Sequence, residues 1–280
     1  MLLYPHISFQ FPSFNLFFLT IQPKIGSNIM HPAENASSES FERDQLAGRR
    51  VQENLLPRSG VQFGALRFDY RIFPSLVLSG DSVEYIELAD GRVLFYMADV
   101  SGHGAAGALV SVLVKGITFG LLPDIEERKL QNPAEVLEAF NRAIRKFDIE
   151  QHVTMFLGLL DPKNKLLHFS NAAHFPATIF ITGQALDYLE LGSLPLGMYQ
   201  APGYVSKEIN LPDEYSIVMF SDGVLEIMAQ ATIQDKEEHL KMLVKSGMRD
   251  VDSLVNELGI DGALNAPDDI ALFTITSSRR

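Results

Sequence analysis

The sequence predicts an α+β fold, because its strand-like and helix-like segments come in groups and do not alternate regularly. Strand patterns fill residues 61–100, two helical segments follow, strands return after residue 152, and polar helical segments precede a last strand. Asp90-Gly91 separates two short apolar runs, and this dipeptide is a strong signal for a tight hairpin between antiparallel strands. The order of segments therefore does not fit the regular alternation of a doubly wound parallel sheet.

The amino-acid composition limits the classes of protein to which this chain can belong. The chain has 280 residues, of which 46% are hydrophobic, enough for a sizeable core in one large domain or two small ones. A formal net charge of −12, without a dense run of Lys or Arg, argues against nucleic acid as a partner. The lack of Cys excludes disulfides, thiolate metal sites and cysteine-based phosphatase chemistry, and it agrees with a cytoplasmic location.

Residues 1–39 are predicted to form a poorly ordered tail and linker. Residues 7–21 are rich in Phe and Leu, but Pro12, Asn15 and the lack of a preceding basic residue make a poor signal peptide. The run is also shorter than a membrane span, so we expect no stable membrane insertion. A cleaved or anchoring segment is the alternative, and Met30 is an alternative start of translation.

Residues 40–57 are predicted to form a helical linker to a domain of residues 58–280. The composition of 41–56 is helical, and Pro57 ends the helix. One side of this helix is partly apolar through Leu46, Val51 and Leu55. These side chains need a partner surface, either on the chain's own domain or on the same helix of a second chain in a homodimer.

The remaining elements follow from apolar periodicity and turn signals. Helices are predicted at 105–121, at 133–147, where Pro133 is a favoured first-turn residue, and in the polar stretches 232–247 and 249–258. Strands are predicted at 83–88, 92–98, 153–160, 165–169, 177–182, 204–209, 215–220 and 270–275.

Four carboxylates stand beside Gly or Pro where a predicted strand begins or ends. Asp99 closes an apolar run and is followed by a glycine-rich turn. Asp222 follows the strand 215–220, Asp268 follows a proline and precedes the last strand, and Asp81 follows a glycine. Taken singly, an acid in such a place is more often a turn former than a ligand.

Convergence of these strand ends would create a need for a cation. Like charges at close range raise one another's proton affinity, and a bound cation is the usual compensation. Oxygen ligands in a chain without Cys favour a hard ion such as Mg²⁺ or Mn²⁺ over zinc or copper. The helix predicted to begin at Ala105 would also aim free backbone N–H groups at an anion held near Asp99.

An ordered set of motifs gives the chain a resemblance to a known family. The motifs are Gly80-Asp81, Asp99-Val-Ser-Gly-His-Gly104, Val153-Thr-Met-Phe-Leu-Gly158, Asn171-Ala-Ala-His174, Leu194-Pro-Leu-Gly197, Ser221-Asp-Gly-Val224 and Asp268-Asp-Ile270. They resemble the metal-dependent serine/threonine protein phosphatases of the PPM family, and within them the bacterial SpoIIE-like branch that includes sigma-factor regulators. The resemblance covers roughly residues 45–277. It implies two stacked, mainly antiparallel β-sheets flanked by helices.

The resemblance also implies a site for two Mn²⁺ or Mg²⁺ ions. Asp99 would bridge both ions, and the backbone carbonyl of Val100 would contribute to one. Asp222 and Asp268 would hold the other ion, while Asp81 would act on the Val100 side, directly or through water. Asp99 and Asp222 would then be catalytic through the water that the ions activate.

Neighbours of these acids receive other roles. His103, in the glycine-flanked turn, is either a proton donor to the substrate or a turn residue with a local hydrogen bond. Asp269 should point to the opposite face of the last strand and support the site without binding an ion directly. His152 and His174 are expected to be structural.

The expected function is hydrolysis of phosphoserine or phosphothreonine on a bacterial regulatory protein. The branch implies a small STAS-type anti-sigma factor antagonist as the substrate. A catalytically impaired pseudophosphatase that acts as a binding module is the alternative, because Ser79 and the atypical tail allow a loss of activity. Ser79 and Glu84 stand where the family commonly has a glycine and an aspartate. A serine hydrolase is disfavoured, since the sequence has no Gly-x-Ser-x-Gly elbow.

Overall fold

The computed structural model describes residues 32–102, 104–183, 185–260 and 266–278. By its internal contacts the chain divides into a unit of residues 1–40 and a unit of residues 41–280. Helix α1 (Pro32–Leu55) begins in the first unit and ends in the second, and every other helix and strand belongs to the second unit.

Helix α1 begins earlier than the sequence predicts. The prediction starts the helix at residue 41 and treats the preceding residues as a linker, whereas the helix begins at Pro32. Proline is favoured in the first turn of a helix, and the Ala and Glu residues that follow are good helix formers. These residues offset the Ser and Asn that made the segment look like a linker.

One sheet of the second unit contains six antiparallel strands. Its order is β1 (Val61–Phe63), β2 (Leu66–Phe73), β11 (Ile270–Ser277), β10 (Tyr215–Phe220), β7 (Ile179–Thr182) and β8 (Ala185–Tyr188). The pair of β2 and β11 runs from Ile270 opposite Phe73 to Ser277 opposite Leu66. Residues that are far apart in the sequence therefore meet in the middle of this sheet.

The other sheet contains five antiparallel strands. Its order is β3 (Ser82–Glu87), β4 (Val93–Val100), β5 (Val153–Asp161), β6 (Leu166–Ala172) and β9 (Lys207–Asn210). The hairpin predicted around Asp90-Gly91 is confirmed, because β3 pairs with β4, and the consecutive strands β5 and β6 also pair. Strand β5 is at the centre of this sheet, between β4 and β6.

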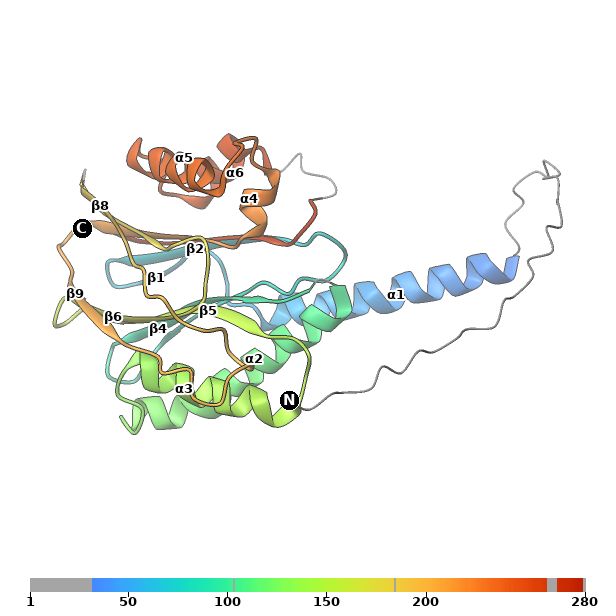
Figure 1. Ribbon diagram of the computed structural model, residues 1–280, viewed down its shortest axis with the longest axis horizontal. Coiled ribbons are helices and arrows are strands. Elements are labelled where there is room, and N and C mark those ends of the chain that lie inside the picture. Colours follow the sequence, from blue (N-terminus) through green and yellow to red (C-terminus); the bar gives the residue numbers. More distant parts are fainter. Residues whose placement is uncertain (1–31, 103, 184, 261–265, 279–280) are drawn as a thin grey trace, which may run out of the picture. The chain divides into compact units, whose positions relative to one another are not determined.

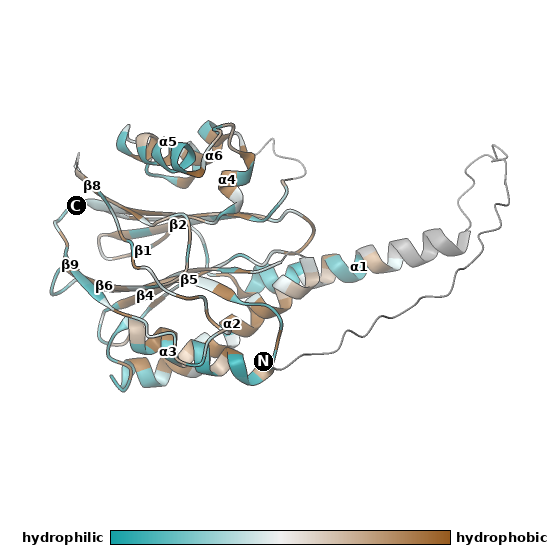
Figure 2. Cartoon of the chain, viewed as in Figure 1, coloured by the Kyte–Doolittle hydropathy of each residue, from teal (hydrophilic) through white to brown (hydrophobic). Residues whose placement is uncertain are grey.

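Helices cover the outer face of each sheet (Figure 1). The five-stranded sheet packs against α2 (Gly104–Glu126) and α3 (Pro133–Ile144), and the short 3₁₀ helix η1 (Arg145–Phe147) follows α3. The six-stranded sheet packs against α4 (Gly223–Ile227), α5 (Ile233–Lys245) and α6 (Val251–Leu258). In Figure 2, α5 mixes hydrophilic and hydrophobic residues, as expected of a helix with one buried side. The layers confirm the predicted α+β sandwich of helix, sheet, sheet and helix.

The core between the two sheets is aromatic. The rings of Phe68 and Tyr85 stack with their centroids 4.8 Å apart, and those of Phe156 and Phe169 stack at 5.7 Å. Gly158 in β5 leaves room for the ring of a phenylalanine in β4, which a Cβ at this position would overlap. Close packing of these large side chains sets the separation of the sheets and thereby the positions of the strand ends.

Side-chain caps define the starts of three outer helices. Asn132 accepts a hydrogen bond from the Glu135 N–H before α3, Thr232 from the Asp235 N–H before α5, and Asp250 from the Ser253 N–H before α6. Each cap satisfies a backbone donor that the first turn of a helix leaves without a partner.

Within the described part of the chain, α2 alone is long and apolar enough to cross a membrane. Its buried side instead binds the five-stranded sheet through polar groups. Thr118 Oγ1 lies 3.0 Å from the Tyr96 hydroxyl, and Lys115 Nζ lies 2.5 Å from Glu84 Oε2. These buried contacts identify α2 as a core helix of the domain.

Two short elements are not predicted from the sequence. Strand β8 has four residues at the edge of its sheet, which is too few for a periodic pattern to stand out. Helix α4 has five residues and begins directly after the turn that carries Asp222.

Candidate metal centre

The antiparallel registers bring the four candidate acids to one end of the stacked sheets. In the five-stranded sheet, Ser82 pairs with Ala98, which places Asp81 beside Asp99. In the six-stranded sheet, the Ser221 N–H donates to the Ala271 carbonyl at 3.0 Å, so that Asp222 lies near the start of β11. The Ser221 hydroxyl then donates to Asp81 Oδ2 at 2.7 Å and joins the two sheets.

Two glycines allow the segments that carry the acids to approach each other closely. A Cβ on Gly80 would lie 3.0 Å from the carbonyl oxygen of Val100. A Cβ on Gly223 would overlap the carbonyl group of Asp269. A larger residue at either position would push the Asp81 loop away from β4, or α4 away from β11.

The clustered carboxylates raise one another's pKa. Burial, followed by the charges of Asp222, Asp268 and Asp269, raises the pKa of Asp99 to about 7. Burial and then the charge of Asp99 raise the pKa of Asp81 well above its ordinary value. Asp222 is exposed as a residue, yet partial burial of its carboxylate and the charge of Asp268 still raise its pKa. The protein alone therefore does not keep all these groups ionised at neutral pH.

The donor set fits a hard divalent cation by its charge and its chemistry. Every candidate offers carboxylate or carbonyl oxygens, which are the ligands that Mg²⁺ and Mn²⁺ prefer. Among the residues that the structure describes, no three Asp, Glu or His side chains form a group that could hold a metal ion as it stands. The carboxylates thus lie close enough to raise one another's pKa, but the described ones do not meet as a group of three around one point.

Asp269 supports the loop of Asp81. Its Oδ1 accepts hydrogen bonds from the backbone N–H and the hydroxyl of Ser75 at 2.7 and 2.8 Å, and its Oδ2 accepts from the Gly80 N–H at 2.7 Å. Both carboxylate oxygens are engaged, and the residue is 4% exposed. This geometry agrees with the expectation that Asp269 faces away from the ions.

The backbone around Val100 is fixed from β5. Val100 is buried, and the next residue, Ser101, exchanges two hydrogen bonds with His152. The Ser101 N–H donates to the His152 carbonyl at 2.9 Å, and the His152 N–H donates to the Ser101 hydroxyl at 3.0 Å. His152 therefore contributes through its backbone, as its expected structural role requires.

The other histidines near the motifs do not add a described ligand. His103, the candidate proton donor, lies outside the described residues. His174 is 4% exposed, and burial lowers its pKa to about 4, so that it is neutral at physiological pH. A neutral, enclosed imidazole agrees with the structural role predicted for His174.

Gln52 of α1 contacts the loop of Asp81, which no sequence motif indicated. Its Nε2 donates to the Ser79 carbonyl at 2.5 Å and to the Ser111 hydroxyl of α2 at 2.9 Å. Its Oε1 accepts a hydrogen bond from the Ser79 N–H at 3.1 Å. One amide side chain therefore holds both backbone groups of the residue two positions before Asp81 and ties this loop to two helices.

The structure explains both departures from the usual motif around Asp81. The Ser79 hydroxyl accepts a hydrogen bond from the Asp81 N–H at 3.1 Å, so serine stabilises the turn. Glu84 forms an ion pair with Lys115 at 2.5 Å, and the two side chains are 5% and 4% exposed. Glu84 is thus neutralised by α2 and does not add to the charge of the acid cluster.

Comparison with known proteins shows the family to which the chain belongs. The family model described as Stage II sporulation protein E (SpoIIE) matches residues 89–277, which is more than half of the chain. The chain belongs to the SpoIIE family. This confirms the resemblance of the sequence to the SpoIIE-like branch of the PPM-type phosphatases. Phosphatases of this type depend on metal ions, generally Mn²⁺ or Mg²⁺.

Relatives of this SpoIIE-family chain come from several bacteria. It is 24% identical over 200 residues to phosphoserine phosphatase RsbP of Bacillus subtilis, covering 69% of this chain and 48% of RsbP. It is 26% identical over 195 residues to phosphoserine phosphatase RsbU of the same organism, covering 69% of this chain and 56% of RsbU. The chain thus spans about half the length of these relatives. The SiaA-PP2C domain of Pseudomonas aeruginosa has the same fold, with a TM-score of 0.72 at 19% identity over 87% of this chain and 99% of that domain.

Proposed function

We propose that this SpoIIE-family chain hydrolyses phosphoserine or phosphothreonine in a regulatory protein. The observation that carries the proposal is the meeting of Asp81, Asp99, Asp222 and Asp268 from two sheets at one end of the domain. When bound, two Mn²⁺ or Mg²⁺ ions compensate the carboxylates, lower the pKa of water and hold phosphate oxygens. The described residues position the ions and the substrate around this chemistry.

Each acid has a proposed task that follows from its place. Asp99 lies next to Asp81 in one sheet, and the charges of Asp222 and Asp268 from the other sheet raise its pKa, so we propose that it would help to hold the ions. Val100 would add its carbonyl on the Asp81 side. Asp222 and Asp268 would hold the second ion. Ser221 binds one oxygen of Asp81 and thereby fixes the orientation of this carboxylate.

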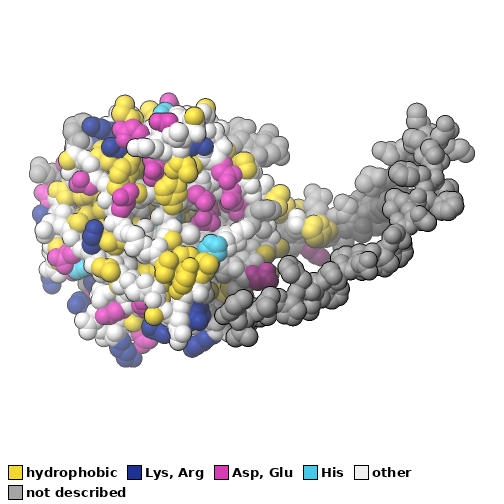
Figure 3. Space-filling view, in the orientation of Figure 1, with side chains coloured by type: hydrophobic (Ala, Val, Ile, Leu, Met, Phe, Trp, Pro, Cys, Tyr) yellow, Lys and Arg dark blue, Asp and Glu magenta, His cyan; other side chains and the backbone are white. Residues whose placement is uncertain are grey.

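The proposed substrate is a small phosphorylated anti-sigma factor antagonist of the STAS type, in the cytoplasm. The names of RsbP and RsbU as phosphoserine phosphatases support the phosphorylated residue. The formal net charge of −12 argues against a nucleic-acid partner. On the face that Figure 3 shows, Lys and Arg side chains are scattered among acidic and apolar ones.

A pseudophosphatase is less well supported than an enzyme. The sequence argument for lost activity rests on Ser79 and the atypical tail. Ser79 stabilises the Asp81 turn, and Glu84 is neutralised by Lys115, so neither residue removes a candidate ligand.

Phosphate release from a phosphorylated candidate partner, with and without Mn²⁺, tests the proposed function. We expect turnover with the ion, and we expect Asp99→Asn and Asp222→Asn to reduce it to the uncatalysed background without unfolding the domain. Asp187→Asn is a matched control, because Asp187 lies exposed on the edge strand β8. Full turnover in excess chelator, or by Asp99→Asn, would rule out the two-ion mechanism.

We also propose that the 41–55 part of α1 pairs with the same helix of a second chain. Leu46 and Val51 are 44% and 58% exposed, so the chain's own domain does not cover them. Gln52, on another side of the helix, contacts the loop of Asp81. Pairing of α1 would therefore bear directly on the acid cluster.

A further inference from the structure

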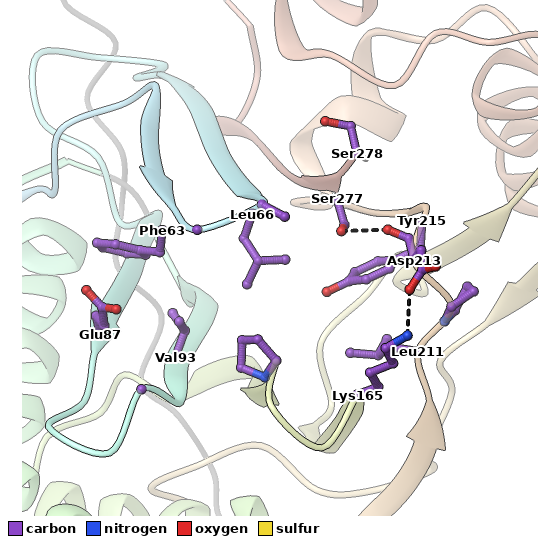
Figure 4. Close-up of a pocket in the computed structure, with 15 residues that line it drawn as sticks. Phe63, Leu66, Glu87, Val93, Lys165, Leu211, Asp213, Tyr215, Ser277 and Ser278 are labelled. Carbon is purple, nitrogen blue, oxygen red and sulfur yellow. Dashed lines mark hydrogen bonds and ion pairs between the residues drawn. The ribbon is translucent and has the colours of Figure 1, made fainter. Parts of the chain in front are cut away.

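A cavity of about 590 Å³ lies between the sheets, at the end opposite to the acids (Figure 4). The strand β4 runs from Val93 in the cavity wall to Asp99, and β10 runs from Tyr215 in the wall toward Asp222. The volume lies within the range of small-molecule sites, roughly 300–1,000 Å³. No residue of the candidate metal centre lines the cavity.

The floor of the cavity is apolar and comes from both sheets. Leu66 of β2, Val93 of β4 and Leu211 before β10 are 4%, 1% and 5% exposed. Phe63 and Pro162 complete the wall. Because these residues belong to well-packed strands and their turns, the space is part of the folded domain and does not need to open for a ligand.

Among the described lining residues, Tyr215 is the buried side chain that carries a polar group. Tyr215 is 6% exposed, and its hydroxyl points into the cavity (Figure 4). Its ring packs against Phe180 at a centroid distance of 5.8 Å, which fixes its direction. The hydroxyl has no hydrogen-bond partner among the described residues, and burial raises its pKa, so it is a neutral donor. An enclosed donor without a partner favours a ligand that carries an acceptor.

The charges at the mouth disfavour an anionic ligand. Lys165 Nζ is already paired with Asp213 Oδ1 at 2.6 Å, and both side chains are largely exposed. Among the lining residues that the structure describes, Glu87 adds a further negative charge on another wall. The net charge of −12 on the whole chain acts in the same direction.

We propose that this cavity binds an uncharged, mainly apolar small molecule with one carbonyl oxygen, which accepts a hydrogen bond from the Tyr215 hydroxyl. The apolar body of the ligand contacts Leu66, Val93 and Leu211. The site is independent of the proposed phosphatase activity, because its walls contain none of the four acids.

The fluorescent probe 6-propionyl-2-(dimethylamino)naphthalene matches this description, since it is an uncharged aromatic molecule with one carbonyl group. Its emission shifts to the blue in apolar surroundings, and the chain has no Trp to interfere. We expect saturable binding of one probe molecule to the full chain. The anionic probe 8-anilinonaphthalene-1-sulfonate should bind more weakly.

Two variants test the position of the probe and its polar contact. Ala65→Phe places a ring in the cavity from an exposed wall position and should abolish binding. Tyr215→Phe keeps the ring and removes the donor, and it should weaken binding by about three- to tenfold, the value of one net hydrogen bond. Tyr199→Phe is the matched control, because Tyr199 is 44% exposed and does not line the cavity.

Thermal unfolding of each variant establishes that it is folded. Loss of binding in Ala65→Phe together with weaker binding in Tyr215→Phe supports the proposal. No saturable binding by the original chain, or unchanged affinity in either variant, overturns it. Phosphate release is measured on the same samples, so that a failure of this proposal is distinguished from a failure of the proposed function.

Discussion

The same strands form both ends of the stacked sheets, but the two ends differ in how their charged groups are compensated. At one end of β4 and β10, Val93 and Tyr215 line an apolar cavity whose charged neighbours reach solvent. At the other end, Asp99 and Asp222 crowd with further acids, and each carries a raised pKa. At the cavity end, Lys165 pairs with Asp213, and both side chains reach solvent. At the acid end, we expect a bound cation to compensate the carboxylates.

Burial of charge alone does not explain this difference. Glu84 is 4% exposed, close to the value for Asp81, but Lys115 neutralises it at 2.5 Å. Asp81 is only 2% exposed and has neighbouring carboxylates in place of a cationic side chain. Removing Lys115 would be costly, because it would leave an uncompensated charge in the interior. The acid cluster therefore gives up stability so that its carboxylates remain available to ions.

The largest expected effect is a pH dependence of stability that belongs to the acid end. The pKa of Asp99 in the folded protein is about 7, above its ordinary value of 3.8, so the folded state binds this proton more tightly than the unfolded state. The stabilising contribution is therefore fully present below about pH 4 and is lost as the pH rises through 7. For one group the slope is at most about 1.4 kcal/mol per pH unit. Denaturant unfolding without metal ions from pH 4 to 8 measures it.

Two comparisons make this pH experiment specific. Asp99→Asn should flatten the fall in the free energy of unfolding, whereas Asp187→Asn should leave it unchanged. Mn²⁺ should restore stability near pH 7, because an ion that binds only the folded state stabilises it. An equally steep fall in Asp99→Asn would show that the acid end is not the source.

The next effect concerns the helix that contacts the acid end. Leu46→Glu and Val51→Glu place charges on the exposed apolar side of α1 and should disrupt a dimer through residues 41–55. Activity and metal affinity should change together with the loss of the dimer, since Gln52 links this helix to Ser79. Sedimentation and Mn²⁺-dependent turnover measure both. If both variants keep the original turnover, metal affinity and oligomeric state, the helix is a passive connector.

A smaller effect is expected from the amide of Gln52. Gln52→Ala removes three hydrogen bonds to Ser79 and Ser111 and should raise the Mn²⁺ concentration for half-maximal turnover by about tenfold. Saturating Mn²⁺ should recover turnover, because no proposed ligand is lost. Gln62→Ala is the matched control, because Gln62 bonds only to Gly64 in a different loop. An unchanged Mn²⁺ requirement in Gln52→Ala would separate α1 from the metal centre.

The sequence predicts the acid end better than the cavity end. Asp99 and Asp222 each stand at the end of an apolar run and before a glycine, and such a local pattern can be recognised from the sequence alone. The cavity has no motif, because its walls come from turns and strand ends far apart in the chain that meet only after the sheets stack. The sequence does not reveal the role of Gln52, for a related reason. A glutamine within a helix is an ordinary helix former, and its task depends on a loop that lies 27 positions later.

The smallest expected effect is that of removing residues 1–29, which should change neither end. The four acids, Gln52 and the cavity walls all lie after Met30, and the family match begins at residue 89. A chain that starts at Met30 retains all of α1 from Pro32 onward. It should therefore show the original unfolding temperature, Mn²⁺-dependent phosphate release and probe binding. Loss of phosphate release alone would assign residues 1–29 to the acid end, and loss of probe binding alone would assign them to the cavity. Either result would contradict the prediction that these residues form a dispensable tail.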